Sequence, residues 1–440
     1  MRSLSQNLIQ TFLVQFPTIF LGVISGVFIT RILGPEGKGV HSIMFANLEL
    51  LALFLSFGAD LGIVYFMSNK KIAPEKLAGL AFWTIVISVI LAFMMIFLSG
   101  KNWNIFFPEK YDGLFYQLFL FVIFCITLIN GLCASFLKGA MQFKRINRIM
   151  LFNSVINVLG FGLLYLLRSS LPFEAGIKSV LIASILMLTL NSVFWIYSFL
   201  KLINIKPDIW GINKMHIKLF YGYTIVGFMG MVVNFFNYRL DIWMVSYYKG
   251  EEQLGYYTLA VNVAQFMLLF SRTMGVIMLP YLSEKSNDER KELFVLFSRI
   301  NTTITLGFLL IFLVVGQLVI PLLYGQVFIA SVPSFYILIF AVFFTCISQL
   351  QTTYFASNNM NMQCLNSNIL ALSATVLFNF LLIPKYGIIG AAYATLISYS
   401  VNFAYLYFIQ LKSIDRKMLN IFVPAPSDYQ KIKALIKKHN

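Results

Sequence analysis

The stretch TRILGPEGKG at residues 30–39 separates two apolar runs, which together extend from Thr11 to Met67. A similar arrangement returns half a chain later, where YRLDIWMVSYYKGEEQLG at residues 238–255 leads from one apolar segment to another. Two pairs of glycines keep the same separation between the two copies: Gly34 with Gly250, and Gly39 with Gly255. A Gly/Pro turn repeated at a fixed spacing between segments of membrane-crossing length indicates a duplicated fold.

The composition indicates a membrane protein. Of the 440 residues, 59% are hydrophobic and 11% are charged, and the mean hydropathy is +0.81. An ordinary soluble domain has roughly 25% charged residues, so we expect an integral membrane protein. The net charge of +16 could indicate a nucleic-acid partner. The basic residues, however, occur in short clusters between apolar runs, as membrane topology signals do, and we expect no nucleic-acid partner.

Twelve segments are long and apolar enough to cross the membrane, because a spanning helix needs about 20 mainly apolar residues. They form two groups of six: 10–31, 40–67, 77–99, 114–137, 147–167 and 176–200, then 219–248, 255–282, 296–321, 333–356, 365–383 and 388–411. The predicted fold class is an all-α polytopic membrane protein with two pseudo-symmetric six-helix lobes around a central cavity. The predicted boundaries are an N-terminal lobe at 1–205, a C-terminal lobe at 206–412 and a basic tail at 413–440.

The distribution of Lys and Arg predicts the orientation. These residues are concentrated on alternate connections between the spans, in the set that includes the N-terminus and the C-terminal tail. Cytoplasmic loops carry the excess of basic residues, so both termini are expected in the cytoplasm. Two interpretations of the tail beyond Lys412 stay open: a helix lying on anionic lipid, or a loosely ordered segment.

Motifs for catalysis and metal binding are absent from the sequence. The three histidines form no H-E-x-x-H zinc motif. The glycines at 34–39 are followed by Val40, where a phosphate-binding loop has Lys and then Ser or Thr. The connections between the spans are too short to hold a catalytic domain. We therefore expect no enzyme, no metal site and no bound cofactor.

Charged residues inside the apolar spans are the main functional candidates, because an Arg or Asp at mid-bilayer costs roughly 2.5–3.5 kcal/mol on insertion scales. Three arginines are candidates for a cationic cavity that binds a phosphate-bearing substrate: Arg31, Arg239 and Arg272. Three acids are candidates for coupling transport to H⁺ or Na⁺: Glu49, Asp60 and Asp241. In the alternative interpretation the charges are structural, and they tie helices together or neutralise one another.

Asparagines inside the spans also allow two interpretations, because an amide can bond a sugar hydroxyl or a neighbouring helix. They are Asn153, Asn157, Asn234, Asn237, Asn262, Asn366 and Asn379. Some lie in the internal repeat, where Phe152-Asn153-Ser154 matches Leu365-Asn366-Ser367. The sequence does not separate the two interpretations.

Five motifs resemble one known family. They are Thr30-Arg31-Ile32-Leu33-Gly34-Pro35-Glu36 with Gly39, Gln142-Phe143-Lys144-Arg145-Ile146-Asn147, Tyr238-Arg239-Leu240-Asp241, Gly255-Tyr256-Tyr257-Thr258-Leu259-Ala260 and Pro384-Lys385-Tyr386-Gly387-Ile388-Ile389-Gly390-Ala391-Ala392. Together they resemble the polysaccharide-flippase (Wzx-type, O-antigen and capsule) branch of the multidrug/oligosaccharidyl-lipid/polysaccharide (MOP) exporter superfamily. The resemblance extends from about residue 5 to residue 411.

The resemblance implies a MATE-like fold and a flippase working by alternating access in the plasma (inner) membrane. Its substrate would be undecaprenyl-diphosphate-linked oligosaccharide, moved from the inner to the outer leaflet for extracellular polysaccharide synthesis. Basic cavity residues of that family meet the diphosphate, which fits Arg239 and Arg272 here. The implied partners are this lipid-linked oligosaccharide, membrane lipids, a polysaccharide polymerase and a chain-length regulator.

Two alternatives remain at this stage. An ion-coupled drug or small-molecule antiporter of the same superfamily would use an acidic, aromatic-lined site, whereas the deep charges here include two arginines. A membrane-bound polysaccharide polymerase, which belongs to a different class, would need a large catalytic loop outside the membrane. The connections between the predicted spans are too short for one.

Overall fold

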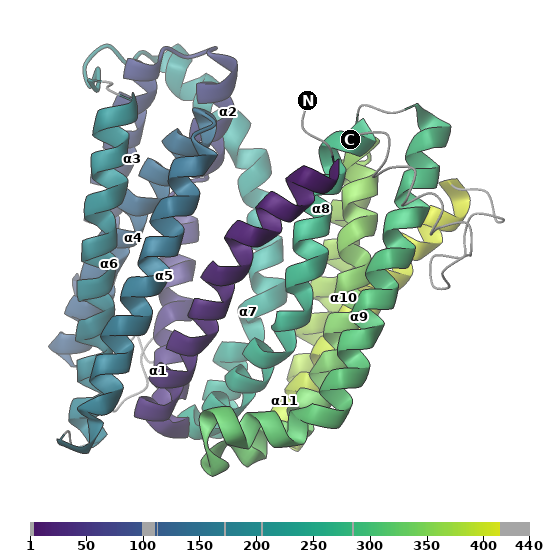
Figure 1. Ribbon diagram of the computed structural model, residues 1–440. Helices are drawn as coiled ribbons and strands as arrows, with labels where there is room; N and C mark the ends of the chain where they lie inside the picture. The colour runs from purple at the N-terminus through teal and green to yellow at the C-terminus, as the bar shows by residue number, and fades with distance from the viewer. Residues whose placement is uncertain are drawn as a thin grey trace. The chain divides into compact units, whose positions relative to one another are not determined.

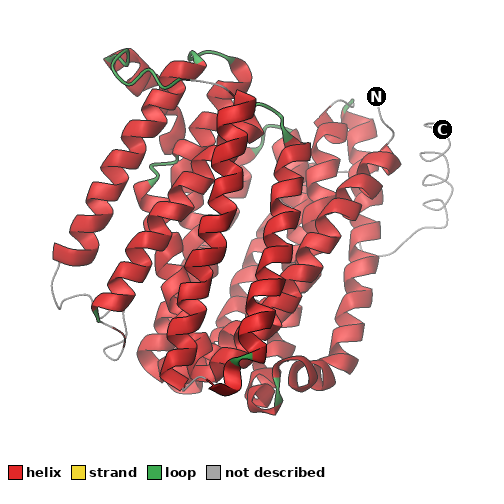
Figure 2. Ribbon diagram, turned by 60° about the vertical axis from the view of Figure 1, so that its left-hand side comes forward, coloured by secondary structure: helices red, strands yellow, loops and turns green. Residues whose placement is uncertain are grey.

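The computed structural model describes residues 4–98, 111, 113–170, 173–203, 206–283 and 286–413. These residues form helices and short connections, with no strand among them, as Figure 2 shows. The predicted basic tail lies outside the described residues, apart from Ser413. Both interpretations of that tail therefore remain predictions.

The chain divides into two compact units, and the division falls inside one helix. The N-terminal unit is Pro17–Phe235, and the C-terminal unit is Phe236–Asn440 together with Met1–Phe16. The division comes about thirty residues later than the predicted lobe boundary at 205/206. The two divisions rest on different criteria, compact packing and counted spans, so the lobe boundary stays a prediction.

Eleven α-helices make up most of the described chain (Figure 1). In the N-terminal half they are α1 Leu4–Leu55, α2 Ala59–Asn69, α3 Pro74–Phe93, α4 Leu114–Gly139, α5 Phe143–Leu166 and α6 Phe173–Ile203. They continue with α7 Lys214–Ala264, α8 Leu268–Ser283, α9 Asn287–Tyr324, α10 Val332–Ser357 and α11 Asn361–Ser413. Helix α3 runs on into a π-helical turn, Met94–Leu98, and short 3₁₀ turns lie at Arg168–Ser170, Gln265–Met267 and Gln326–Ser331.

Three of these helices are bent at a glycine. Helices α1, α7 and α11 contain 52, 51 and 53 residues, and their only non-helical residues are Gly34 (φ 63°), Gly250 (φ 79°) and Gly387 (φ 59°). A straight helix of that length would measure about 75 Å, more than twice the ~30 Å hydrocarbon core. Helix α11 therefore holds two whole predicted spans, 365–383 and 388–411, one on each side of its bend. Helices α1 and α7 each hold one whole span and the first part of the next, because span 40–67 continues into α2 and span 255–282 into α8.

The Gly/Pro turn predicted in this stretch, from Leu33 to Gly39, was wrong in its extent, because within it only Gly34 leaves helical geometry. Glycine has no Cβ, so it tolerates a positive φ that other residues resist. Pro35 follows as the first residue of the next helical arm, where its missing N–H costs no hydrogen bond. The remaining glycines of the stretch are helical.

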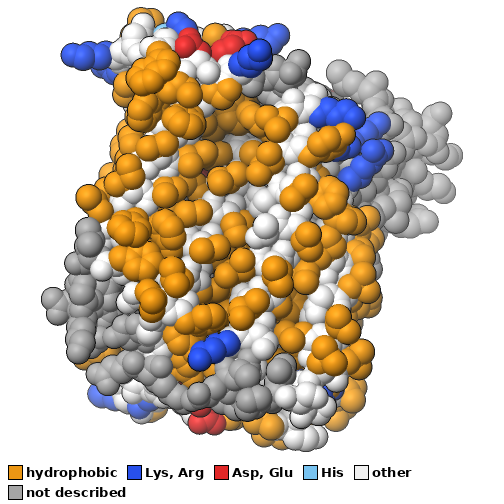
Figure 3. All heavy atoms as spheres, turned by 90° about the vertical axis from the view of Figure 1, so that its left-hand side faces the viewer, with side chains coloured by type: hydrophobic (Ala, Val, Ile, Leu, Met, Phe, Trp, Pro, Cys, Tyr) orange, Lys and Arg blue, Asp and Glu red, His pale blue; other side chains and the backbone are white. Residues whose placement is uncertain are grey.

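The described helices are those of a multi-pass membrane protein. Nine of them, in the part of the chain that the structure covers, are long and apolar enough to cross a membrane. Figure 3 shows hydrophobic side chains over the middle of one face, with charged side chains mainly at its two ends. A soluble monomer rarely exposes so large an apolar surface. The total of twelve spans stays a prediction.

The predicted span at 40–67 is broken where α1 ends and α2 begins. Phe57 and Gly58 have positive φ values of 50° and 68°. The hydroxyl of Ser88 on α3 donates to the carbonyl of Leu55, which the break would otherwise leave without a helical partner. The next turn, at Gly62, packs closely on α7, and a Cβ there would lie 2.6 Å from Thr224.

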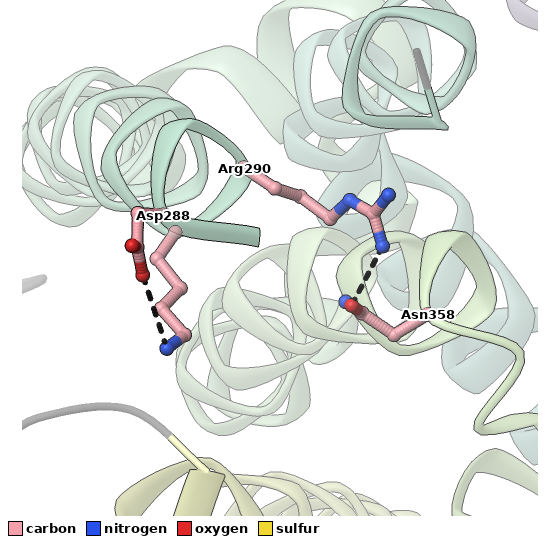
Figure 4. Close-up of polar contacts among 4 residues, drawn as sticks. Asp288, Arg290 and Asn358 are labelled. Carbon is pink, nitrogen blue, oxygen red and sulfur yellow. Dashed lines mark hydrogen bonds and ion pairs between the residues drawn. The ribbon is translucent and has the colours of Figure 1, made fainter. Parts of the chain in front are cut away.

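A set of hydrogen bonds and aromatic contacts organises one end of the C-terminal unit. Arg290 donates to the carbonyls of Leu282 and Ser357 at 2.8 and 3.2 Å and to Asn358 Oδ1 at 2.8 Å, the last shown in Figure 4. The guanidinium thus bonds the last turns of α8 and α10, where helices expose free carbonyls. Phe294 stacks on Tyr354 beneath this end, with ring centroids 4.4 Å apart.

Candidate functional site

A layer of three buried polar side chains lies inside the C-terminal unit, where α7 meets both arms of α11. Asn237 Oδ1 accepts hydrogen bonds from Thr375 and Ser398, at 2.8 and 3.1 Å. The two hydroxyl oxygens lie 2.7 Å apart, and Ser398 is also 2.9 Å from the carbonyl of Ala371. The layer is possible because the bend at Gly387 places residues 375 and 398 opposite each other.

A buried carboxylate, that of Asp241, lies next to this layer, one helical turn nearer the bends at Gly250 and Gly387. Asp241 follows Asn237 by one turn and is 8% exposed. The Tyr257 hydroxyl donates to Asp241 Oδ2 and lies 3.1 Å from Thr395 Oγ1, and the Ile242 amide donates to Asp241 Oδ1 at 2.9 Å. Tyr257 lies beyond the bend at Gly250, so the bend brings the second arm of α7 back against the first.

Asn379 belongs to the same level, because it lies one turn beyond Thr375 in the direction in which Asp241 lies beyond Asn237. It is 1% exposed, and neither its amide oxygen nor its nitrogen has a hydrogen-bond partner among the described residues. A buried polar group without a partner is costly inside a protein. A carboxylate, an amide and a hydroxyl from Asp241, Asn379 and Thr395 offer the oxygen ligands that suit a hard cation, and the carboxylate alone suits a proton.

Two arginines lie beside this cluster. Arg239 and Arg272 both act electrostatically on the buried Tyr399, which also feels Asp241. Arg272 acts in addition on Tyr238, whose ring packs against the Tyr399 ring at 5.5 Å. The structure thus brings three predicted site residues together around one tyrosine: Arg239, Asp241 and Arg272.

The Arg272 guanidinium is available to a ligand. The residue is exposed, and it makes no hydrogen bond or ion pair within the residues that the structure describes. It acts electrostatically on two tyrosines, Tyr238 and Tyr399, and on the buried Cys346. An arginine in this state presents up to five N–H donors in a planar fork that matches phosphate oxygens.

The other three predicted site residues belong to the N-terminal unit. Arg31 is exposed and donates to the Tyr165 hydroxyl at 3.3 Å, and Glu49 is exposed on α1. Asp60 lies in the first turn of α2, directly after the break in the helix. Its Oδ1 atom is buried and has no hydrogen-bond partner among the described residues.

The sequence analysis missed the side chains that surround Asp241. Tyr257 and Thr395 were not singled out, although Tyr257 lies in one of the quoted motifs. Asn237 and Asp241 are four residues apart, a spacing that places both on one helix face and could have indicated a polar stripe. The tyrosine and the threonine come from other helical arms, so only the tertiary structure shows that they meet Asp241.

In the described part of the chain, no group of three or more His, Cys, Asp or Glu side chains lies close enough together to hold a metal ion. The four cysteines, at positions 125, 133, 346 and 364, are free thiols.

Comparison with known sequences points to one family. The sequence profile described as "Polysaccharide biosynthesis protein" matches residues 28–333. The chain is 25% identical over 396 residues to the "Probable low-salt glycan biosynthesis flippase Agl15" of Haloferax volcanii, covering 87% of this chain and 78% of that one. It is also 29% identical over 219 residues to the "Capsular polysaccharide biosynthesis protein CapF" of Staphylococcus aureus, covering 46% of this chain and 55% of that one.

Comparison with solved structures concerns the fold. The lipid II flippase MurJ in an inward closed conformation superposes with a TM-score of 0.68 at 17% identity, covering 97% of this chain and 92% of that one. An inward-facing multidrug resistance MATE family transporter of the MOP superfamily gives 0.64 at 14% identity, covering 96% of each chain. The predicted fold class, a helical membrane protein with a MATE-like fold, is confirmed.

Proposed function

This chain belongs to the polysaccharide biosynthesis protein family, and we propose that it is a flippase rather than an enzyme. Its proposed substrate is an undecaprenyl-diphosphate-linked oligosaccharide repeat unit. The flippase moves this unit from the inner to the outer leaflet of the plasma membrane for the synthesis of O-antigen or capsule. Both termini lie in the cytoplasm, and the polymerase and chain-length regulator act on the delivered unit.

The observation that carries the proposal is the pair of arginines beside Tyr399. A diphosphate cannot cross hydrocarbon unaided, because a bare charge in a medium of low dielectric is strongly unfavourable. Arg239 and Arg272 lie close enough to act on the same tyrosine, and Arg272 has no ion pair among the described residues. Together they form a cationic site for the diphosphate, while the polyprenyl chain stays in the lipid. Arg31, in the N-terminal unit, is a separate candidate for binding the substrate.

Coupling to H⁺ or Na⁺ is assigned to the cluster around Asp241. The carboxylate, Asn379 and Thr395 supply the oxygens, and Tyr257 holds the carboxylate in place. Arg239 interacts electrostatically with Asp241. When a cation or proton neutralises the carboxylate, the positive charge of Arg239 is no longer offset and attracts the diphosphate more strongly. Asp60, with its unbonded buried oxygen, is the second candidate, and Glu49 is the third.

The test of substrate binding is the variant Arg272→Ala. If its guanidinium binds the diphosphate, polymer export falls by about tenfold or more, since a charge-assisted hydrogen bond contributes roughly 1.5–3 kcal/mol. Export is measured as surface polysaccharide in a deletion strain that carries the variant, with membrane insertion checked by immunoblot. Arg272→Lys keeps the charge and should retain part of the export.

The matched control is Arg168→Ala, because this exposed arginine lies over the Tyr165 ring at 3.7 Å in the other unit. It should export like the wild type. Wild-type export by Arg272→Ala would reduce this arginine to a packing role. Transport of cationic drugs without any loss of surface polysaccharide in the deletion strain would favour the antiporter alternative.

A further inference from the structure

Three asparagines inside the N-terminal unit have buried amide oxygens that no described residue bonds. They are Asn130 on α4, Asn153 on α5 and Asn191 on α6. Asn130 and Asn191 are only 9% and 7% exposed. The three oxygens are buried, so bulk solvent does not compensate them, and an unbonded buried polar atom is costly.

The three side chains lie at one level of the bundle formed by α4, α5 and α6. A small apolar cluster joins these helices, and Cys133, Ile149 and Trp195 belong to it. Asn130 lies one turn before Cys133, Asn191 lies one turn before Trp195, and Asn153 lies one turn after Ile149, so each shares a helix face with its cluster residue. Because α5 runs opposite to α4 and α6, all three asparagines lie on the same side of the cluster along the bundle axis. The ring contact of Phe152 with Phe194, at 4.4 Å, confirms that these parts of α5 and α6 are level.

Neighbouring protein donors do not fill this site. The nearest hydroxyls along the same helices, on Ser154 and Ser192, donate to the carbonyls of their own helices, Ser154 to Met150 at 3.1 Å and Ser192 to Leu188 at 2.8 Å. A ligand must therefore supply the donors to the three amide oxygens.

A cation is a poor match for the site. Helices α4 and α5 contain no acidic residue, and the only one in α6, Glu174, lies near its start, far from Asn191. Arg145 lies two turns from Asn153 on α5, and its Nε donates to Ser198 at 3.0 Å. Neutral amides near an arginine do not balance the charge of a buried ion. Water carries two donors and no charge, and buried water typically makes about three hydrogen bonds to such groups.

We propose that Asn130, Asn153 and Asn191 form a water-binding site that links α4, α5 and α6 inside the N-terminal unit. The matching position of the C-terminal unit, Asn402, has protein partners. Asn402 donates to Ser367 and Asn368 at 3.3 and 3.1 Å. Ser367 matches Ser154 in the internal repeat, but Val155 stands where Asn368 does, so the N-terminal unit has no amide at that position.

The first test labels bound water directly. The full chain in lipid nanodiscs is exposed to hydroxyl radicals made by X-rays, and the modification of Trp195 is measured by mass spectrometry. Trp195 is only 7% exposed, so water within the site is needed for strong labelling. Asn191→Leu should lower that labelling about threefold or more, because a site stripped of a polar partner no longer retains its water. Asn402→Leu is the matched control and should leave it unchanged.

The second test asks whether Asn130 and Asn191 share a ligand although they do not bond each other. Thermal midpoints are compared for Asn130→Ala, Asn191→Ala and the double variant, or for the milder Ser substitutions if an alanine variant fails to fold. A shared water network makes the two losses clearly non-additive, whereas independent sites add. Additive losses together with unlabelled Trp195 in the wild type would overturn the proposal.

A third measurement separates water from a metal ion. The thermal midpoint of the wild type is recorded in sodium chloride and in choline chloride at equal ionic strength. A water site predicts that Asn191→Leu leaves any difference between the two salts as it is in the wild type. A sodium-specific stabilisation that disappears in Asn191→Leu would overturn the water site in favour of a cation, since a bound ion stabilises by mass action. None of the three tests depends on the flippase proposal.

Discussion

At the scale of single residues, the chemistry of the C-terminal unit centres on Asp241. Its carboxylate is buried and bonded by the Tyr257 hydroxyl and the Ile242 amide, so the protein compensates part of the cost of burying it. The same carboxylate lies in the electrostatic environment of Arg239. A carboxylate held in this way can be neutralised by a proton or balanced by a bound cation, which is the property that a coupling site needs.

Asp241→Asn tests that assignment. The amide keeps the size of the carboxylate and can still accept from Tyr257, but it can neither titrate nor balance a cation. We expect export to fall about tenfold or more, because interactions of a buried charge contribute about 1.5–3 kcal/mol. Surface polysaccharide and the thermal midpoint of the purified variant are the two measurements.

Glu252→Gln provides the comparison, because Glu252 accepts a hydrogen bond from the Tyr256 hydroxyl at 2.9 Å and lies outside the Asp241 cluster. It should retain export. If Asp241→Asn exported normally while Asp60→Asn did not, the coupling site would move to the N-terminal unit and the Asp241 cluster would be structural.

At the scale of helices, the glycine bends decide which side chains meet. Gly250 lies between Asp241 and Tyr257, and Gly387 lies between Thr375 and Ser398. Without these bends the two members of each pair would lie far apart along one axis, at 1.5 Å per residue. Lys249 strengthens the arrangement, because its Nζ donates to the carbonyl of Pro384 at 3.0 Å and so links the two bends.

Gly250→Ala should therefore destabilise the protein. The residue has φ 79° and ψ 176°, a combination that is essentially restricted to glycine, and a side chain there costs about 1–3 kcal/mol. We expect the thermal midpoint to fall by several degrees, measured by scanning fluorimetry on the purified chain.

The control is Gly230→Ala, also on α7. Gly230 is helical, and a Cβ there would meet nothing within 4 Å. Alanine is a better helix former than glycine, so this variant should be neutral or slightly more stable. Equal effects of the two substitutions would show that the backbone at Gly250 is not under the constraint described here.

At the scale of the whole molecule, the exposed apolar side chains and the basic connections predict how the chain lies in the membrane. Large hydrophobic side chains such as Leu159, Leu163 and Leu166 are exposed on α5, which suits contact with lipid. The basic excess on alternate connections predicts cytoplasmic termini. In this predicted orientation, the end of the C-terminal unit where Arg290 joins α8 and α10 lies at the cytoplasmic side.

Reporter fusions test the orientation. Green fluorescent protein attached after Asn440 should fluoresce, because it folds in the cytoplasm, whereas alkaline phosphatase attached there should be inactive. The same phosphatase inserted after Gly250 should be active, since this bend is predicted to face the outside. The reverse pattern at both sites would contradict the predicted topology and with it the direction of transport.

The hydrophobic pattern was sufficient to predict the membrane-spanning helical fold, because lipid leaves a long apolar segment almost no other way to satisfy its backbone. The in-span charges Arg239, Asp241 and Arg272 could also be found from sequence, since each stands out against apolar neighbours. The turn at residues 33–39 was predicted too long, because glycine and proline there form a sharp bend at Gly34 and not a loop.

Only the tertiary structure showed which side chains contact one another. The Tyr257 hydroxyl donates to Asp241, two arginines act on Tyr399, and several buried asparagine oxygens have no partner among the described residues. Each of these contacts depends on helical segments that lie apart in the sequence. A local pattern specifies the face on which a residue lies, whereas the packing of helices specifies what that face meets. The sequence therefore determined that this chain is a membrane protein of a polysaccharide biosynthesis family, and the packing determined where its polar groups meet.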